Sequence, residues 1–202
     1  MITEETQNED KAIAFKPLLA EVKNGGFSAE IEKYTCANSN FQPKRNYISL
    51  SQIHLSVEEI INQFRGGFED TIAGRLKCYK GYQMEKDLMQ RIKSVFGARI
   101  KTETEIAAFD GLVKGHPDFT FNDYPSDCKS VLMDDWFPKD GKLPRRIYWQ
   151  MQAYMKYSGK DKALVIFESR ESGKLIDYWV RANWNIQNEI EQKLQQIVKA
   201  VS

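Results

Sequence analysis

The sequence contains no run of apolar residues long enough to cross a membrane. A transmembrane helix needs about 20 mostly apolar residues. The N-terminus, MITEETQNEDK, is polar and acidic, unlike the basic and then apolar start of a secretory signal. The sequence therefore predicts neither a membrane-spanning segment nor a membrane partner.

Cysteine is scarce as well. Cys36, Cys78 and Cys128 are odd in number and lack CxxC spacing, which argues against a disulfide framework, a zinc ribbon and a four-cysteine iron–sulfur cluster. Such cysteine usage is typical of a reducing compartment, so we expect a cytoplasmic protein.

The chain has 202 residues, 42% of them apolar and 28% charged, which is an ordinary globular composition. At ~150 residues per domain it forms one domain with some surplus, or two very small ones. Because periodicity is weak at the start, we expect residues 1–45 to be a partly ordered lead-in with one short helix near 11–23. Residues 46–202 then form the main domain.

The net charge of +1 hides an uneven distribution. Bases outnumber acids eight to two in residues 74–101 and seven to two in residues 137–162, whereas acids outnumber bases eight to two in residues 103–136. If the fold brings these segments together, an anion-repelling centre lies inside an anion-attracting rim. A polyanionic substrate then needs a cation such as a metal ion at that centre. Ordinary solvated surface charge is the alternative.

Apolar periodicity predicts the secondary structure. We expect helices over about 47–64, 82–96, 145–158 and 183–200, and strands over 105–114, 117–122, 127–133, 162–168 and 175–181. The turn-rich spacer 122–126 favours a hairpin between the second and third strands. This order of elements predicts a mixed α/β or α+β domain with a central sheet.

Helix 82–96 carries one unusual charge. At ~100° per residue its apolar side chains share one face, and Glu85 is the one charged residue on that face. A carboxylate on a buried face is unfavourable unless it is paired or binds a cation. A half-exposed glutamate favoured by the helix dipole is the alternative.

Asp127 and Lys129 lie two residues apart, so on a strand both point to the same face. A hairpin can bring Asp118 beside Asp127, and a divalent cation relieves the repulsion between two such carboxylates. Glu85 supplies a third carboxylate if its helix packs on this sheet. Lys129 can then stabilise a negative transition state or orient a water, as phosphodiester hydrolysis requires. A surface hairpin with a salt bridge is the alternative.

These residues resemble the PD-(D/E)XK nuclease superfamily, and within it the RecB-like, phage-type exonuclease branch. The resemblance covers residues 79–181 and rests on four motifs in the expected order: a helical glutamate, Gly-x-x-Asp, Asp-x-Lys and Gln-x-x-x-Tyr. The residues that carry it are Glu85, Gly115, Pro117, Asp118, Asp127, Cys128, Lys129, Gln150 and Tyr154.

The resemblance implies a restriction-endonuclease-like core, which is a central mixed sheet flanked by helices. We also expect an N-terminal helical extension over the substrate cleft. It implies DNA cleavage with Mg²⁺ or Mn²⁺. Glu85, Asp118, Asp127 and the backbone carbonyl of Cys128 would be the metal ligands. Lys129 would position or activate the water, while Gln150 and Tyr154 would contact the DNA backbone or support the lysine.

Other residues are weaker candidates. Arg145 and Arg146 open the helix that carries Gln150 and are candidate phosphate clamps. His116 is a candidate extra ligand or phosphate contact, with a structural or surface role as the alternative. Trp136 and Phe137 are the aromatic residues best placed to stack on exposed bases.

We therefore expect a metal-dependent deoxyribonuclease. The branch favours an exonuclease that processes DNA ends in recombination or repair, alone or with a separate recombination or helicase protein, since the chain has no helicase motif. The alternatives are a structure- or sequence-selective endonuclease on the same core and a catalytically inactive DNA-binding relative. The complete carboxylate and lysine set argues against the last. The sequence allows an oligomer.

Overall fold

The structure is a computed structural model that describes residues 45–66, 72–139 and 141–202. The chain divides into two compact units, residues 1–41 with 70–80 and residues 42–69 with 81–202, and the second unit carries the predicted site. The predicted helix near 11–23 and the N-terminal extension lie outside the described residues, so the proposed boundary at residue 45 stays a prediction.

The second unit is built on two sheets. The larger sheet has the strand order β2–β5–β6–β7–β8, and the smaller has the order β1–β4–β3. In the larger sheet β6 and β7 run parallel, whereas its other pairs are antiparallel, so the sheet is mixed as predicted. The strands are β1 (Ile48–Ser49), β2 (Ile100–Lys101), β3 (Ile106–Ala108), β4 (Val113–Gly115), β5 (Phe119–Phe121), β6 (Tyr124–Val131), β7 (Lys162–Ser169) and β8 (Leu175–Arg181).

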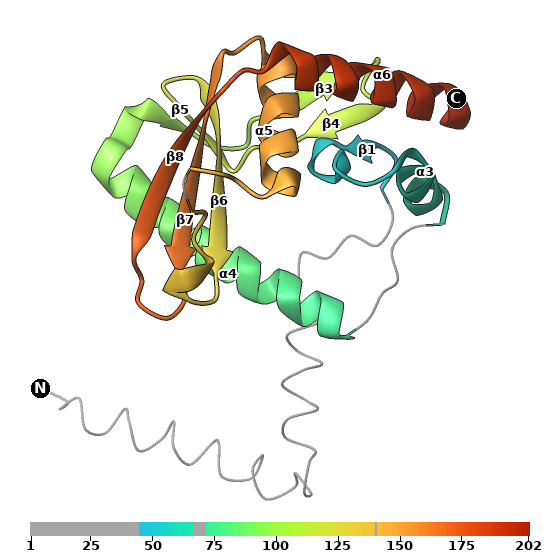
Figure 1. Cartoon of the computed structure of the whole chain (residues 1–202). Coiled ribbons are helices and arrows are strands. Elements are labelled where there is room, and N and C mark those ends of the chain that lie inside the picture. Colours follow the sequence, from blue (N-terminus) through green and yellow to red (C-terminus); the bar gives the residue numbers. More distant parts are fainter. Residues whose placement is uncertain (1–44, 67–71, 140) are drawn as a thin grey trace, which may run out of the picture. The chain divides into compact units, whose positions relative to one another are not determined.

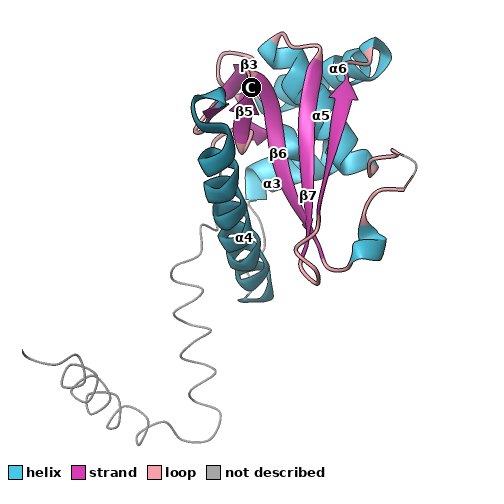
Figure 2. Ribbon diagram, turned by 90° about the vertical axis from the view of Figure 1, so that its left-hand side faces the viewer, coloured by secondary structure: helices cyan, strands magenta, loops and turns pink. Residues whose placement is uncertain are grey.

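Helices cover both faces of the larger sheet (Figure 2). Residues 81–96 of helix α4 (Ile72–Phe96) lie on one face, while α5 (Arg145–Ser158) and α6 (Trp184–Val201) lie on the other. Helix α3 (Val57–Gly66) packs beside α6 (Figure 1). This arrangement confirms the predicted central mixed sheet flanked by helices. None of the described helices is long and apolar enough to cross a membrane.

The C-terminal half matches the sequence prediction closely. Helix α5 has the predicted bounds and ends at Gly159, whose φ of 66° is the left-handed conformation that glycine adopts without strain. Asn183 caps α6 by accepting hydrogen bonds from the backbone N–H groups of Asn185 and Ile186. Strands β7 and β8 fall within a residue of the predicted ranges. Local signals therefore suffice in this half of the chain.

The predicted helix over 47–64 is wrong at its start. Ile48 and Ser49 form a short strand that pairs in parallel with β4, a single 3₁₀ turn follows, and α3 begins only at Val57. The helix start is set by Ser56, whose Oγ accepts from the Glu59 N–H while Glu59 Oε2 accepts from the Ser56 N–H. Such a reciprocal capping pair fixes the first helical turn.

The predicted single strand over 105–114 is instead the hairpin β3–β4. Phe109, Asp110 and Gly111 all have positive φ, at 50°, 52° and 83°, and these angles reverse the chain direction. The second predicted hairpin, β5–β6, is confirmed, but its turn is tighter than expected. Asn122 and Asp123 form it alone with φ of 50° and 65°, and β6 begins directly afterwards.

The apolar face of α4 is centred differently from the prediction. Leu88, Met89 and Ile92 are buried, and Phe96 packs edge-on against Phe121 with ring centroids 5.3 Å apart, whereas Val95 is 73% exposed. At ~100° per residue, the centre of this buried stripe falls within ~10° of the direction of Glu85. The correction therefore strengthens the expectation that Glu85 faces the sheet.

Candidate functional site

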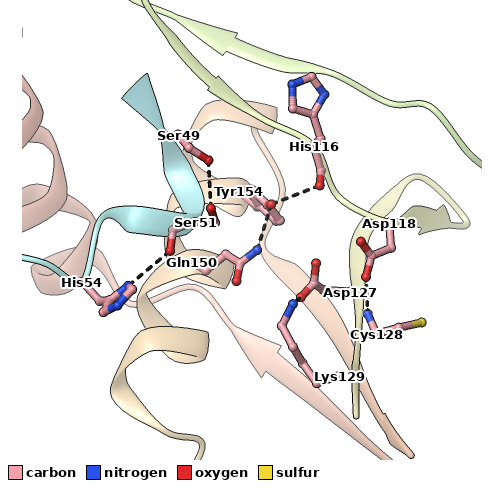
Figure 3. A network of polar contacts seen from close by, with 10 residues as sticks. All are labelled: Ser49, Ser51, His54, His116, Asp118, Asp127, Cys128, Lys129, Gln150 and Tyr154. Atoms are coloured by element: carbon pink, nitrogen blue, oxygen red, sulfur yellow. Dashed lines mark hydrogen bonds and ion pairs between the residues drawn. The ribbon is translucent and has the colours of Figure 1, made fainter. Parts of the chain in front are cut away.

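The candidate site lies where β5 and β6 part. Strand β5 pairs only with the first three residues of β6, ending with Phe119 opposite Ser126. Strand β6 continues to Val131 beside β7. After Ser126, no strand among residues 45–66, 72–139 and 141–202 pairs with it on the β5 side. Asp118, which directly precedes β5, fills that place, because its Oδ2 accepts a 2.6 Å hydrogen bond from the Cys128 N–H (Figure 3).

This hydrogen bond also orients a carbonyl. The N–H and C=O of one residue in a strand point to the same neighbouring strand. The Cys128 carbonyl therefore faces the same open side of β6 as its N–H, toward Asp118. The Cys128 side chain instead projects from the face of the sheet, into the apolar cluster under α4 with Leu88 and Phe119.

Asp127 and Lys129 share the other face of β6 and form an ion pair (Figure 3). The Asp127 carboxylate is almost completely buried, while 28% of the Lys129 side chain is exposed. Among the described residues, the Lys129 ammonium is the only partner of Asp127 Oδ2. One cationic end group thus reaches both the buried carboxylate and the surface.

The electrostatics of the site are dominated by three carboxylates. Burial raises the pKa of Asp118 well above its usual range, and the charges of Asp127 and Glu85 raise it further. Burial and then the Asp127 charge also raise the pKa of Glu85. Burial acts to lower the pKa of Lys129, but the surrounding carboxylates, Asp127 first, more than offset it, so the pKa is raised. Three acids thus share the single lysine beside them.

A cleft with a volume of about 230 Å³ reaches two of these groups, Glu85 and Lys129. Glu85 contributes from α4, and Lys129 and Ser130 contribute from β6. Arg146 from the first turn of α5 lies on its wall. The cleft thus combines carboxylates, a lysine and an arginine, which suits an anionic substrate held beside a cation.

Within the described part of the chain, no three His, Cys, Asp or Glu side chains are arranged to hold a metal ion as they stand. Two of the carboxylates are engaged elsewhere, since Asp127 is turned to Lys129 and Asp118 to the Cys128 N–H. The donor chemistry nevertheless fits a hard divalent cation, because it consists of carboxylate oxygens and a backbone carbonyl with excess negative charge. The predicted ligand set stays a prediction.

Gln150 and Tyr154 lie one helical turn apart on α5, and both are buried. Gln150 Nε2 donates to the Tyr154 hydroxyl over 2.9 Å, and that hydroxyl donates to the His116 carbonyl over 3.2 Å (Figure 3). These bonds fix the chain two residues before Asp118. The pair therefore supports the backbone that carries the first aspartate, while contact with DNA stays a prediction.

Gly115 is required by this support. An added Cβ at Gly115 would lie 2.6 Å from Tyr154 Cε1 and 2.8 Å from Leu50 Cδ1. These distances are too short for real contacts, so only glycine lets the tyrosine ring pack on the strand. The glycine of the Gly-x-x-Asp motif thereby has a packing role here.

Of the remaining candidates, Arg145, Arg146 and His116, only Arg146 lines the cleft. Arg145 stacks its guanidinium over the Trp149 ring, 4.7 Å from the centroid, whereas Arg146 lines the cleft. The His116 side chain is half-exposed, points away from Asp118 (Figure 3) and lies 3.8 Å from Glu105. The structure thus brings Arg146 to the carboxylates but not the ring of His116.

Glu168 is a residue of the cleft that the sequence did not predict. Glu168 on β7 is only 7% exposed, lines the cleft and forms an ion pair with Arg91 of α4. Arg91 Nε also donates to Asp87 over 3.1 Å. The available signal was an acid at the end of the otherwise apolar run KALVIFE, where a buried charge needs a partner.

Comparison with known proteins identifies solved structures that share the fold of this chain. No family model and no curated protein matches the sequence. Among solved structures, an alkaline exonuclease (LHK-Exo) from Laribacter hongkongensis superposes with a TM-score of 0.58 at 15% identity, covering 84% of this chain and 91% of that one. A phage-related exonuclease from Haemophilus somnus 129PT superposes with a TM-score of 0.53 at 13% identity, covering 77% and 96%.

The chain has the fold of these exonucleases. A third structure, SSO0001, is similar to the same extent, with a TM-score of 0.59, 13% identity and 89% of both chains covered. The similarity thus spans most of each chain.

Proposed function

We propose that this protein is a metal-dependent deoxyribonuclease that hydrolyses phosphodiester bonds. The observation that carries the proposal is the convergence of Glu85, Asp118 and Asp127 on Lys129 where β5 leaves β6. Carboxylates at this density repel a phosphate, so they are useful to a nuclease only as ligands of a cation. The fold shared with exonucleases supports this interpretation.

The proposed cofactor is Mg²⁺ or Mn²⁺, held by Glu85, Asp118, Asp127 and the Cys128 carbonyl. When bound, such an ion neutralises charge on the phosphate and lowers the pKa of a water molecule. Two features of this chain support the ligand set. Asp127 Oδ2 is buried, with Lys129 as its only partner in the part of the chain that the structure describes, and burial and repulsion raise the pKa of Asp118 and Glu85.

The protein's own groups have separate tasks in this proposal. The Lys129 ammonium, held by Asp127, faces the cleft and stabilises negative charge that develops on the phosphate. It also orients the attacking water. Arg146 binds a phosphate at the cleft wall. Gln150 and Tyr154 keep the backbone before Asp118 in place through the His116 carbonyl.

We further infer that the enzyme removes nucleotides from DNA ends. LHK-Exo was crystallised with dAMP, a nucleoside monophosphate, which is what an exonuclease releases from a DNA end. We propose that the same reaction here processes ends in recombination or repair, in the cytoplasm, with a separate recombination or helicase protein as a candidate partner. The endonuclease remains the competing reaction on the same core.

The test is cleavage of end-labelled linear DNA with Mg²⁺, with Mn²⁺ or with EDTA, and with covalently closed circular DNA in parallel. We expect mononucleotide products from linear DNA, only with a metal ion, and no cleavage of the circle. Cleavage of the circle would instead establish an endonuclease. Binding without cleavage under every condition would indicate an inactive DNA-binding relative.

A further inference from the structure

The loop between β6 and α5 exposes three large apolar side chains within five residues. Leu132 is 52% exposed, Met133 is 40% exposed and Trp136 is 60% exposed. Single exposed apolar residues are common on protein surfaces, whereas a group of them indicates a contact with something else. We call Leu132, Met133 and Trp136 the apolar platform.

Hydrogen bonds tie the start of this loop, residues 130–134, to the β7–β8 turn. The Arg170 N–H donates to the Val131 carbonyl over 2.9 Å, and the Arg170 guanidinium donates to Ser130 Oγ over 2.8 Å. Further along, Ser172 Oγ donates to Asp134 Oδ1 over 2.6 Å. The start of the loop is therefore held in one position.

The far side of the platform is anchored as well. Phe137 is 7% exposed, and the next carbonyl, of Pro138, accepts a 2.7 Å hydrogen bond from the Tyr178 hydroxyl. Within the loop, the Trp136 N–H donates to the Met133 carbonyl over 3.0 Å in a 3₁₀ turn. Of these two adjacent aromatic residues, Phe137 is therefore buried and Trp136 is exposed to solvent.

The platform is a direct continuation of the strand that carries Lys129. Ser130 lines the cleft, and Leu132 follows two residues later. A strand advances ~3.3 Å per residue, so the platform begins ~10 Å from Lys129. In duplex DNA one strand advances ~3.4 Å per nucleotide, so this distance corresponds to at most about three nucleotides of an unpaired strand.

The local charges favour bases over phosphates as the ligand. Asp134 and Asp135 lie in the same 3₁₀ turn as Trp136, so a phosphate would be repelled there. The cations lie to the side, with Lys174 Nζ 5.9 Å from the Phe137 ring centroid and Arg170 at Ser130. Base faces are uncharged and stack on aromatic side chains, and they are accessible only in an unpaired strand.

We propose that the apolar platform stacks the bases of an unpaired DNA strand a few nucleotides from the cleaved bond, with Trp136 as the main contact. The proposal rests on the proposed nuclease function. It adds a substrate preference, because a stacked single strand is held by its bases as well as by its phosphates. Duplex DNA, with its bases paired, gains nothing from this contact.

The test measures binding of the full-length protein in EDTA to a labelled oligodeoxythymidine of 12 nucleotides, a matched abasic strand and a blunt duplex. Trp136→Ala should weaken binding of oligodeoxythymidine about 10- to 100-fold, and should leave the other two ligands within about twofold. Trp136→Phe should restore most of the affinity. The control is Trp184→Ala, since Trp184 is 70% exposed at the opposite end of the sheet, at the start of α6.

Three outcomes overturn the proposal. Trp136→Ala could leave oligodeoxythymidine binding unchanged, it could weaken all three ligands equally, or it could change the oligomeric state without changing DNA affinity. The last would assign the platform to a contact between copies of the chain. Wild-type protein that cleaves DNA while Trp136→Ala binds normally refutes only this inference, whereas wild-type protein that neither binds nor cleaves DNA refutes the proposed function itself.

Discussion

The two halves of β6 differ in the partners that form hydrogen bonds with their backbone N–H and C=O groups. The first half, residues 124–126, is paired with β5 on one side. The second half, residues 127–131, keeps its pairing with β7 but has lost β5, and the carboxylate of Asp118 takes the place of the missing strand at Cys128. A buried N–H without a partner is costly, so some acceptor had to enter here.

This difference explains where the candidate site lies. When a side-chain carboxylate replaces a strand, a negative charge is brought beside Asp127 and within reach of Glu85. Where β5 stops pairing with β6, the fold therefore places the Asp118 carboxylate, leaves the Cys128 carbonyl without a strand partner among the described residues, and leaves space for a substrate. If this comparison holds, the second half of β6 is specialised for chemistry and the first half for stability.

The largest effect is expected for Lys129→Ala. Loss of one electrostatic group at a transition state typically lowers the rate on the order of 10²- to 10³-fold, and DNA binding should change little because Arg146 and the proposed metal ligands are retained. Lys129→Arg should rescue poorly, since the guanidinium is bulkier and keeps its proton. Single-turnover cleavage and thermal melting should be measured together.

The matched control for that variant is Lys101→Ala. Lys101 lies on β2 of the same sheet and forms an exposed ion pair of 2.6 Å with Asp123, next to the first half of β6. This variant should cleave DNA at the wild-type rate. Full activity of Lys129→Ala would remove the catalytic role of the lysine and most support for a nuclease.

Metal binding should stabilise the wild-type protein. At a Mn²⁺ concentration 100 times the dissociation constant, mass action adds about 2.7 kcal/mol to the free energy of unfolding. Asp118→Asn keeps an acceptor for the Cys128 N–H but removes a ligand charge, so it should fold normally and lose this gain. Thermal melting with Mn²⁺ and with EDTA measures both effects. Asp123→Asn, at an exposed carboxylate, should respond to Mn²⁺ as wild type does, and an equal response from Asp118→Asn would contradict the metal site.

Gly115→Ala should destabilise the fold by about 1–3 kcal/mol, because the new methyl group overpacks Tyr154 and Leu50. The shift should also lower the cleavage rate, since Tyr154 would be displaced from the His116 carbonyl. Denaturant unfolding measures the first effect. Gly66→Ala is the control, because an added Cβ there meets nothing within 4 Å; identical stability of the two variants would show that the close packing is not needed.

The smallest expected effect is a difference between Arg145 and Arg146 of α5 in the salt dependence of DNA binding. Arg146→Ala removes about one phosphate contact and should reduce the log–log salt slope of DNA binding by roughly 0.7–0.9. Arg145→Ala should change the slope less, because its guanidinium is stacked on Trp149. Titrations at several salt concentrations distinguish them. A larger change from Arg145→Ala would place the DNA path on the other side of α5.

Several features of the site could be predicted because they depend on short-range patterns. Asp127 and Lys129 are on one face of a strand because side chains alternate, and Gln150 and Tyr154 are on one face of a helix because four residues make about one turn. The β5–β6 hairpin followed from Asn122 and Asp123, whose types tolerate positive φ. Each of these expectations needs only neighbours in the sequence.

Other features could not be predicted because they depend on partners far away in the chain. Glu168 looks like the end of an apolar strand until Arg91, 77 residues earlier, is placed beside it. Ile48 and Ser49 resemble a helix start until β4 pairs with them. Val95 and Glu85 both fit the apolar arc of α4, and only packing on the sheet decided that Val95 is exposed and Glu85 faces the cleft.

The sequence by itself determined the order of the elements, the spacing of the acids and the lysine, and the requirement that buried carboxylates find a counter-charge. The reason is that propensity, periodicity and charge are local quantities. Only the tertiary structure decided that the β5–β6 ladder ends after Ser126, that Asp118 fills the gap, and that Trp136 is displayed while Phe137 is buried. Those outcomes depend on which distant backbone and side-chain groups compete for the same space and the same hydrogen bonds.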